Sequence, residues 1–342
     1  MDLGLFLSFQ VNNESELTGH YQRSLRYAVA ADRAGYRYVW VPEHHLVQFL
    51  PSPSALIHAA YIGQHVSCQV GTAVVVLPYH QPLQLAGEIN QTDQILEGRF
   101  ELGVARGAYR YEFDKFGLDG AASLPHFIEM LEALRALWRD PTAPASFSGT
   151  MVNFEDAYIW PRPYQQPHPP IWLAAQAPAA VEDAAARGYD VLNSLFVWDV
   201  ERAREVAAAF HRGRERAEGG GAAQRLGMTR YALALDDEAD VMPILQTVLD
   251  GWRVHIQLHN YTQNADPRGV VTSRPDPNEP TLAQLREMLL IGTPDELVRK
   301  VALYRDMGLS VLNLNSTFGA PEDLTLRSIE LFAEINEKVA TL

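Results

Sequence analysis

The sequence has one cysteine, no long apolar run and no basic cluster, and each of these absences excludes a class of protein. Cys68 stands alone among 342 residues, so no internal disulfide forms, as is usual in a reducing compartment. We interpret Cys68 as a small buried hydrophobe at a strand start. No segment approaches the roughly 18 consecutive apolar residues of a membrane span. The first residues lack the basic region of a secretory signal, so we expect a cytoplasmic protein.

The charge balance is unfavourable for polyanionic partners. The formal net charge is −14, and the arginines at 212–216 are interspersed with glutamates, as on a solvated helix face. Because nucleic acids and anionic membrane surfaces attract cationic patches, we expect neither as a partner. Hydrophobic residues make up 47% of the chain, which is enough for one large core.

Strand-like and helix-like segments alternate along the whole chain. Eight segments have the apolar, β-branched or aromatic character of strands, and a helical pattern follows each one. These strands are expected at residues 3–9, 36–41, 69–77, 100–105, 171–175, 189–193, 228–235 and 310–314. Residues 69–77 are apolar on both faces, which indicates a buried parallel sheet. Eight such units predict a (β/α)8 barrel. An open doubly wound sheet is disfavoured, because no G-x-G-x-x-G follows the first strand.

Two stretches interrupt this alternation. Residues 141–169 are rich in proline and aromatic side chains, and residues 236–290 follow the seventh strand. We expect a single domain over 1–342 that carries an insertion at about 236–290. Loops after barrel strands lie on the catalytic face, so the insertion is expected to act as a lid. For its tip, residues 262–280, a disordered surface excursion is the alternative.

The tripeptide Glu43-His44-His45 directly follows the second predicted strand. Adjacent side chains there point in different directions, so one histidine can face the barrel mouth while its neighbour packs sideways. Histidine suits proton transfer near neutral pH, and the carboxylate can orient a ring or raise its pKa. Two structural histidines bonded to loop carbonyls would also explain the pair. No metal site is expected, because no H-E-x-x-H motif, cysteine pair or third ligand is nearby.

Two further segments end at the same face of the predicted barrel. The third strand carries small residues over 71–78, which leaves room for a flat ligand, although a plain core strand explains them too. Arg106 lies just past the fourth strand, where a guanidinium can clamp a phosphate or a carboxylate. Arg99, at the opposite end of that strand, is interpreted as structural.

These segments together resemble the bacterial-luciferase-like flavin-dependent monooxygenases, and the resemblance covers nearly the whole chain. It is carried by the order and spacing of EHH at 43–45, GTAVVVLP at 71–78, DQILEGRF at 93–100, ARGAY at 105–109, FGLD at 116–119 and IGTPDE at 291–296. The resemblance implies a barrel that binds reduced FMN at its carboxyl face. A separate NAD(P)H-flavin reductase supplies that flavin, and O2 converts it to a flavin hydroperoxide that oxygenates an organic substrate. It also implies a dimer, which we expect to be a homodimer.

The resemblance also assigns roles to single residues. His44 is expected to be the acid/base group, supported by Glu43 and His45. The flavin ring is expected on Ala73 and Val74, at a bond that is often a cis peptide in this family. The phosphate is expected at Arg106, with Tyr109 beside it. Luciferases carry an acidic residue and hydroxyls where this chain has Gln176, Ala177 and Ala180, so we expect weak, dissociable FMN binding that retains Gln176 and the amides at the helix start.

The reaction and the substrate are less sharply defined by the sequence. Aldehyde oxidation, Baeyer–Villiger insertion, hydroxylation and carbon–sulfur cleavage all fit the resemblance. Aromatic residues expected near the mouth favour a small, largely apolar substrate: Phe6, Phe9, Phe49, Tyr79, Tyr109, Phe196 and Trp198. A deazaflavin-dependent hydride-transfer enzyme on the same barrel is the first alternative. A non-catalytic flavin-binding subunit is the second, and the presence of Glu43-His44-His45 argues against it.

Overall fold

The computed structural model describes residues 1–8, 10–11, 14–217, 221, 223–260, 266 and 268–342. Phe9 and part of the expected 262–280 lid tip lie outside the described residues. No described helix is both long enough and apolar enough to cross a membrane.

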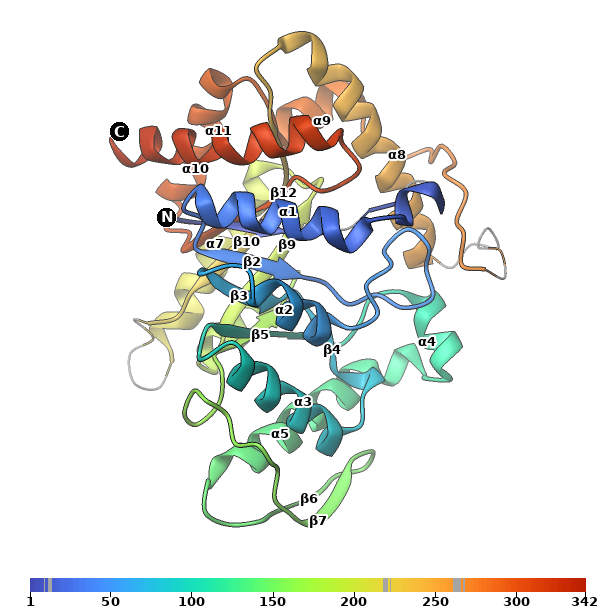
Figure 1. The fold of residues 1–342 in the computed structure, drawn as a ribbon, viewed down its shortest axis with the longest axis vertical. Helices are drawn as coiled ribbons and strands as arrows, with labels where there is room; N and C mark the ends of the chain where they lie inside the picture. The colour runs from blue at the N-terminus through green and yellow to red at the C-terminus, as the bar shows by residue number, and fades with distance from the viewer. Residues whose placement is uncertain (9, 12–13, 218–220, 222, 261–265, 267) are drawn as a thin grey trace.

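Within the described residues, eight parallel strands close into a barrel (Figure 1). The closure is made by β12, which pairs with β1 on one side and with β10 on the other. In order around the barrel the strands are β1 (Asp2–Phe6), β2 (Tyr38–Val41), β3 (Gln69–Thr72), β5 (Phe100–Ala105), β8 (Ile171–Ala174), β9 (Asp190–Phe196), β10 (Leu226–Ala234) and β12 (Val311–Asn315). The predicted (β/α)8 fold is therefore confirmed, with every strand close to its expected position.

Helices cover the outside of the barrel, and their apolar faces pack on the outward side chains of the strands. They are α1 (His20–Arg33), α2 (Ala55–Gly63), α3 (Pro82–Ile95), α5 (Ser123–Arg139), α6 (Pro178–Ala186), α7 (Val200–Glu215), α10 (Pro294–Asp306) and α11 (Glu322–Ala340). Short 3-10 turns lie at η1 (Glu14–Leu17), η2 (Leu77–Tyr79), η3 (Gly120–Ala122) and η4 (Glu238–Asp240). The proline-rich stretch 141–169 contains the antiparallel hairpin β6 (Ala145–Ser148) and β7 (Asn153–Ala157).

Two features at the barrel's carboxyl face differ from a regular strand and helix alternation. The third strand stops at Thr72, passes through a cis Ala73–Val74 peptide and resumes as β4 (Val75–Val76), which pairs with β5. The cis bond lies where the family resemblance implied it. A short helix, α4 (Arg110–Phe116), follows β5 and was not predicted.

Two tryptophans fill the barrel interior below the mouth. Trp40 and Trp172 are fully buried and meet edge to face, with ring centroids 5.2 Å apart. Gly4 makes room for them, because a Cβ at that position would lie 2.9 Å from Trp40 Nε1 and 2.2 Å from the Asn313 side-chain oxygen. Arg225 lies 4.4 Å above the Trp172 ring and pairs with Glu101. The lumen is therefore packed, and a ligand has room only at the mouth.

The predicted insertion follows the seventh strand, β10. It contains α8 (Val241–Asn260), α9 (Leu282–Met288) and β11 (Leu290–Gly292), and β11 adds to the edge of β10. Its second half is anchored by cations at the carboxyl end of α9. The fully buried Arg230 donates to the carbonyl oxygens of Leu195 and Met288, and Lys300 Nζ donates to the Arg286 carbonyl at 2.6 Å.

The middle of the insertion rests on the loop after β2. The Gln48 amide donates to the Gly269 carbonyl at 3.1 Å. Gly269 has a φ of +76°, and a Cβ there would lie 1.9 Å from the Leu46 carbonyl oxygen. Only glycine allows this close approach between the two backbones.

Gly269→Ala should therefore lift the insertion from residues 46–48, and limited proteolysis should cleave the insertion at least several-fold faster than in the wild type. Gly35→Ala is the matched control. Gly35 also has a positive φ, of +82°, but a Cβ there would meet no atom within 4 Å, so only backbone strain of about 1 kcal/mol is added. Equal cleavage rates in the two variants would show that the Leu46 contact does not hold the insertion.

Candidate active site

Glu43 is a buried carboxylate at the end of β2. Its Oε1 lies 2.7 Å from His45 Nε2 and 2.9 Å from His80 Nε2, and its Oε2 accepts a bond of 3.2 Å from the Val76 amide. Burial raises the pKa of Glu43, but the bonds from His45 and His80 outweigh burial and leave the pKa below its ordinary value. Burial likewise opposes the charged form of His80, and Glu43 raises the His80 pKa above 6.5. Glu43 therefore holds His45 and His80 and not His44.

Glu112 on α4 is the carboxylate that holds His44. Its Oε1 lies 3.2 Å from His44 Nδ1 and accepts a bond of 2.6 Å from the His45 amide. Its Oε2 accepts the Tyr79 hydroxyl at 3.2 Å. Because a carboxylate accepts, the proton of a neutral His44 lies on Nδ1, and Nε2 is the ring nitrogen left for a reactant. The two adjacent histidines thus point to two different carboxylates.

Tyr109 fixes the plane of the His44 ring and connects it to the insertion. The two rings stack with centroids 4.7 Å apart and an interplanar angle of 24°. The Tyr109 hydroxyl lies 2.7 Å from His255 Nδ1 on α8, and His255 Nε2 lies 3.1 Å from His259 Nε2. Burial lowers the pKa of His255 well below 6.5, so His255 is neutral at pH 7. Tyr109 itself is fully buried, and its ring also meets those of His255 and His259 edge to face.

Ala73 and Val74 form an apolar ledge at the mouth. Both are only partly buried, and both pack on the cluster of Phe6, Trp40 and Trp172. Figure 1 shows β4 and β5 side by side at this edge, as their pairing requires. The ledge is apolar, and it continues into the tightly packed interior of the barrel.

Three exposed residues lie beyond the ledge. Arg106 follows β5 and makes no hydrogen bond or ion pair to the part of the chain that the structure describes. Gln176 and Ala177 follow β8, where Gln176 Oε1 accepts a bond of 3.3 Å from the Ser194 amide and Ala177 precedes the first turn of α6. No cluster of three or more potential metal ligands occurs among the described residues.

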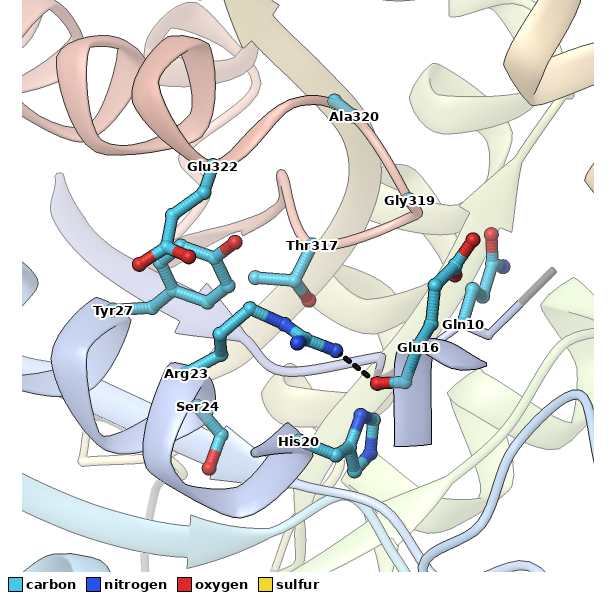
Figure 2. Close-up of a pocket in the computed structure, with 10 residues that line it drawn as sticks. All are labelled: Gln10, Glu16, His20, Arg23, Ser24, Tyr27, Thr317, Gly319, Ala320 and Glu322. Carbon is cyan, nitrogen blue, oxygen red and sulfur yellow. Dashed lines mark hydrogen bonds between the residues drawn. The ribbon is translucent and has the colours of Figure 1, made fainter. Parts of the chain in front are cut away.

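Two pockets open near this face. Figure 2 shows the first, of about 250 Å³, between the start of α1 and the loop after β12. Its guanidinium, Arg23, is engaged by the carbonyl oxygens of Glu16 and Thr18, and burial followed by the charge of Arg23 lowers the pKa of His20 to about 4. The second pocket, of about 440 Å³, contains His44. The site with an available acid/base group is therefore the second pocket.

The family model described as luciferase-like monooxygenase matches residues 1–310. The chain belongs to this family. The expected family membership is thus confirmed.

Several relatives of this luciferase-like chain are known. The oxygenase component of flavin-dependent trigonelline monooxygenase from Acinetobacter baylyi is 33% identical over 59% of this chain, and the match spans 56% of that protein. Monooxygenase RslO1 from Streptomyces bottropensis has a similar structure, with a TM-score of 0.84, 24% identity and 99% coverage of both chains.

Two further structures share the luciferase-like fold. The oxygenating constituent of 3,6-diketocamphane monooxygenase of Pseudomonas putida, in complex with FMN, has a TM-score of 0.78 and 18% identity and covers 99% of this chain and 98% of its own. An F420-dependent secondary alcohol dehydrogenase has a TM-score of 0.77 and 16% identity with the same coverage. At these identities the likeness shows the fold.

The structure brings some of the predicted site residues together and separates others. Glu43, His44, His45 and the buried Tyr109 form one cluster, whereas Arg106, Gln176 and Ala177 lie on exposed loops. The sequence interpretation missed Glu112, His80 and His255 as site residues. His80 offered the only signal, because it is a polar residue directly after the apolar segment 71–79; Glu112 stands among Arg110, Asp114 and Lys115 and offered none.

Glu43→Gln should lower the pKa of His80 below 6.5, because it removes the charge, and weakens the bond, that oppose burial. An NMR titration of the histidine ring protons measures this change. Glu88→Gln is the control, since Glu88 contributes the smallest of the charge effects on His80 and makes no bond to it. A His80 pKa that is equally lowered in both variants would contradict the assignment of Glu43 as its partner.

Proposed function

We propose that this protein is the oxygenase component of a two-component flavin-dependent monooxygenase, which uses reduced FMN and O2 to oxygenate a small organic substrate. The observation that carries the proposal is the pair of Glu112 and His44, which leaves His44 Nε2 for proton transfer beside a pocket at the barrel mouth. Membership of the luciferase-like monooxygenase family supports it, and so does the similarity to an oxygenase component.

The residues present fit a flavin. Ala73 and Val74 offer an apolar surface for a ring system, and the Arg106 guanidinium has no partner in the described chain. The start of α6 adds backbone amides near Gln176 and Ala177, although it contributes no hydroxyl or side-chain cap. A bound reduced flavin supplies the electrons and activates O2. We propose that the sparse donors make FMN a dissociable reactant.

In this proposal His44 is the group that donates or accepts the proton. Glu112 holds Nδ1 and Tyr109 holds the ring plane, so Nε2 can deliver or accept a proton without reorientation of the ring. We propose that the insertion also excludes water, because α8 packs against α4 and Gly269 packs on the loop that follows His44. We propose that residues 236–290 act as the lid over the site.

The proposed partners are a separate NAD(P)H-flavin reductase and a second copy of this chain. The exposed apolar surface supports the homodimer. Ile57 on α2 is 74% exposed and Tyr61, one turn later, is 37% exposed. Apolar side chains on one face of a helix commonly mark a contact between chains.

A deazaflavin-dependent hydride transfer is the second candidate function. The similarity of the fold to an F420-dependent dehydrogenase favours it, and the ledge at Ala73 and Val74 accepts either ring system. It needs neither O2 nor a flavin reductase. If the protein were a non-catalytic flavin-binding subunit, the pair of Glu112 and His44 would have no catalytic role.

His44→Ala should reduce substrate-dependent O2 consumption by roughly 10²- to 10⁴-fold while binding of reduced FMN persists, because a general acid/base is lost. The assay combines the protein, FMN and a flavin reductase with a panel of aldehydes, ketones and aromatic acids. His65→Ala, which alters an exposed histidine at the end of α2, should retain wild-type consumption. Wild-type turnover by His44→Ala would remove His44 from the mechanism. Anaerobic oxidation of an alcohol by the deazaflavin would favour the second function.

Arg106→Ala should weaken binding of reduced FMN by about 10- to 100-fold and change binding of reduced riboflavin by less than about twofold, because only FMN has the phosphate. Anaerobic fluorescence titration measures both constants. Arg110→Ala, four residues along the same segment, removes a guanidinium that already faces Asp114 and serves as the control. Equal weakening for both flavins would show that Arg106 does not bind the phosphate.

A further inference from the structure

We propose that the pocket beside His44 selects substrates in which a carboxylate is attached to an apolar body, and that Lys115 and Arg268 bind the carboxylate. The oxidation of such a substrate rests on the function proposed above, whereas its recognition depends only on the pocket.

The pocket has the size and the lining of a small-molecule site. Its volume is about 440 Å³, and it lies between the loop after β2, helix α4 and the insertion. Leu46, Val47 and Tyr111 make much of its wall apolar, and His44 lies at its edge. A substrate seated there therefore has its apolar part within reach of the proposed acid/base group.

The charged side chains among the described residues that line the pocket are both cationic. Lys115 and Arg268 line it, and none of the described lining residues is acidic. The chain as a whole has a net charge of −14, so two cations without an acidic residue beside them in one pocket stand out from the overall charge balance. Two cations on one apolar pocket in such a protein favour an anionic ligand group.

Lys115 is available to bind that group. It forms no salt bridge in the described chain, and its Nζ lies 5.5 Å from the centre of the Tyr111 ring, which directs the ammonium over the pocket wall. The nearest acid on the same helix, Asp114, faces Arg110 at 3.8 Å. The buried Glu112 is bonded to His44, His45 and Tyr79. The Lys115 ammonium is therefore not paired with a carboxylate of the described chain, and it can bind a ligand carboxylate.

Arg268, a residue of the insertion, lines the same pocket. Its Nε and Nη2 bond Asp266 at 3.0 and 2.8 Å, which positions the guanidinium and leaves Nη1 for a ligand. The next residue, Gly269, packs on the Leu46 carbonyl and holds this part of the insertion at the rim. Because Asp266 neutralises much of the Arg268 charge, Lys115 supplies most of the attraction.

The pocket differs from the proposed flavin surface. Neither Ala73, Val74 nor Arg106 lines it, so the phosphate proposed at Arg106 and the substrate carboxylate proposed at Lys115 do not compete. His44 belongs to the loop that follows β2, and its side chain lines the pocket. This arrangement would present the apolar body of the substrate to both the flavin and His44.

The lysine content of the chain allows a direct test without flavin or turnover. The sequence has three lysines, Lys115, Lys300 and Lys338. Reductive methylation with 13C-formaldehyde keeps their charge and gives each an NMR signal. Titration with 2-naphthoate should shift the Lys115 signal to saturation and leave that of Lys338 unchanged. The neutral isostere 2-naphthamide should bind at least about fivefold more weakly.

Single substitutions distinguish the contribution of Lys115 to binding from that of Arg268. Saturation-transfer NMR should show naphthoate binding weakened about five- to tenfold by Lys115→Met and less by Arg268→Gln. Lys338→Met makes the same charge change on an exposed part of α11 and should not weaken binding. An unshifted Lys115 signal, or equal binding of naphthoate and naphthamide, would overturn the proposal.

The outcome is separable from that of the proposed function. If naphthoate binds through Lys115 but no compound in the panel stimulates O2 consumption, the anion site stands and the monooxygenase proposal fails. If neutral compounds alone stimulate O2 consumption and naphthoate does not bind, the monooxygenase proposal stands and the anion site fails.

Discussion

Two buried carboxylates govern the geometry of the barrel mouth. A carboxylate removed from water is costly unless hydrogen bonds replace its hydration, and both Glu43 and Glu112 are fully engaged. Their partners come from the loop after β2, from β4 and from the 3-10 turn that follows β4. Each partner is thereby held in one orientation. His44 and His45, though adjacent, diverge because each is bound to a different carboxylate, and only His44 reaches the pocket.

The insertion completes the same site from a distant part of the sequence. His255 on α8 meets the Tyr109 hydroxyl, and Tyr109 stacks on His44. The buried Arg230 and Lys300 hold the carboxyl end of α9, while Gly269 seats the middle of the insertion on Leu46. Arg268 is the residue of the insertion that faces the pocket. In the sequence, the contact of His255 precedes it and those of Gly269 and α9 follow it, so the insertion is attached on both sides of Arg268. A displacement of α8 would be transmitted to the His44 ring through one aromatic contact.

The barrel could be predicted because its signals are local and repeated: apolar strands, glycine stops and helical faces recur eight times. The position of Glu43, His44 and His45 followed from the rule that loops after barrel strands form the active face. The pairing of the carboxylates could not be predicted. Glu112 lies on a short helix whose aromatic residues have no clear period, and a buried acid there has the same sequence appearance as an exposed one. Glu43 was expected to support His44, but the turn directs it to His45 and to His80, 37 residues away.

The packed interior has an optical consequence. Trp40 and Trp172 lie fully buried beneath the ledge, and Ala73 and Val74 rest directly on their cluster. Both indoles are shielded from water and fixed by edge-to-face contact, so their emission depends on what occupies the ledge more than on the solvent. A yellow chromophore seated on Ala73 would be within energy-transfer range of two rigid donors. If a flavin binds at the ledge as proposed, these two buried indoles would report its occupancy against the emission of the exposed Trp160 and Trp198.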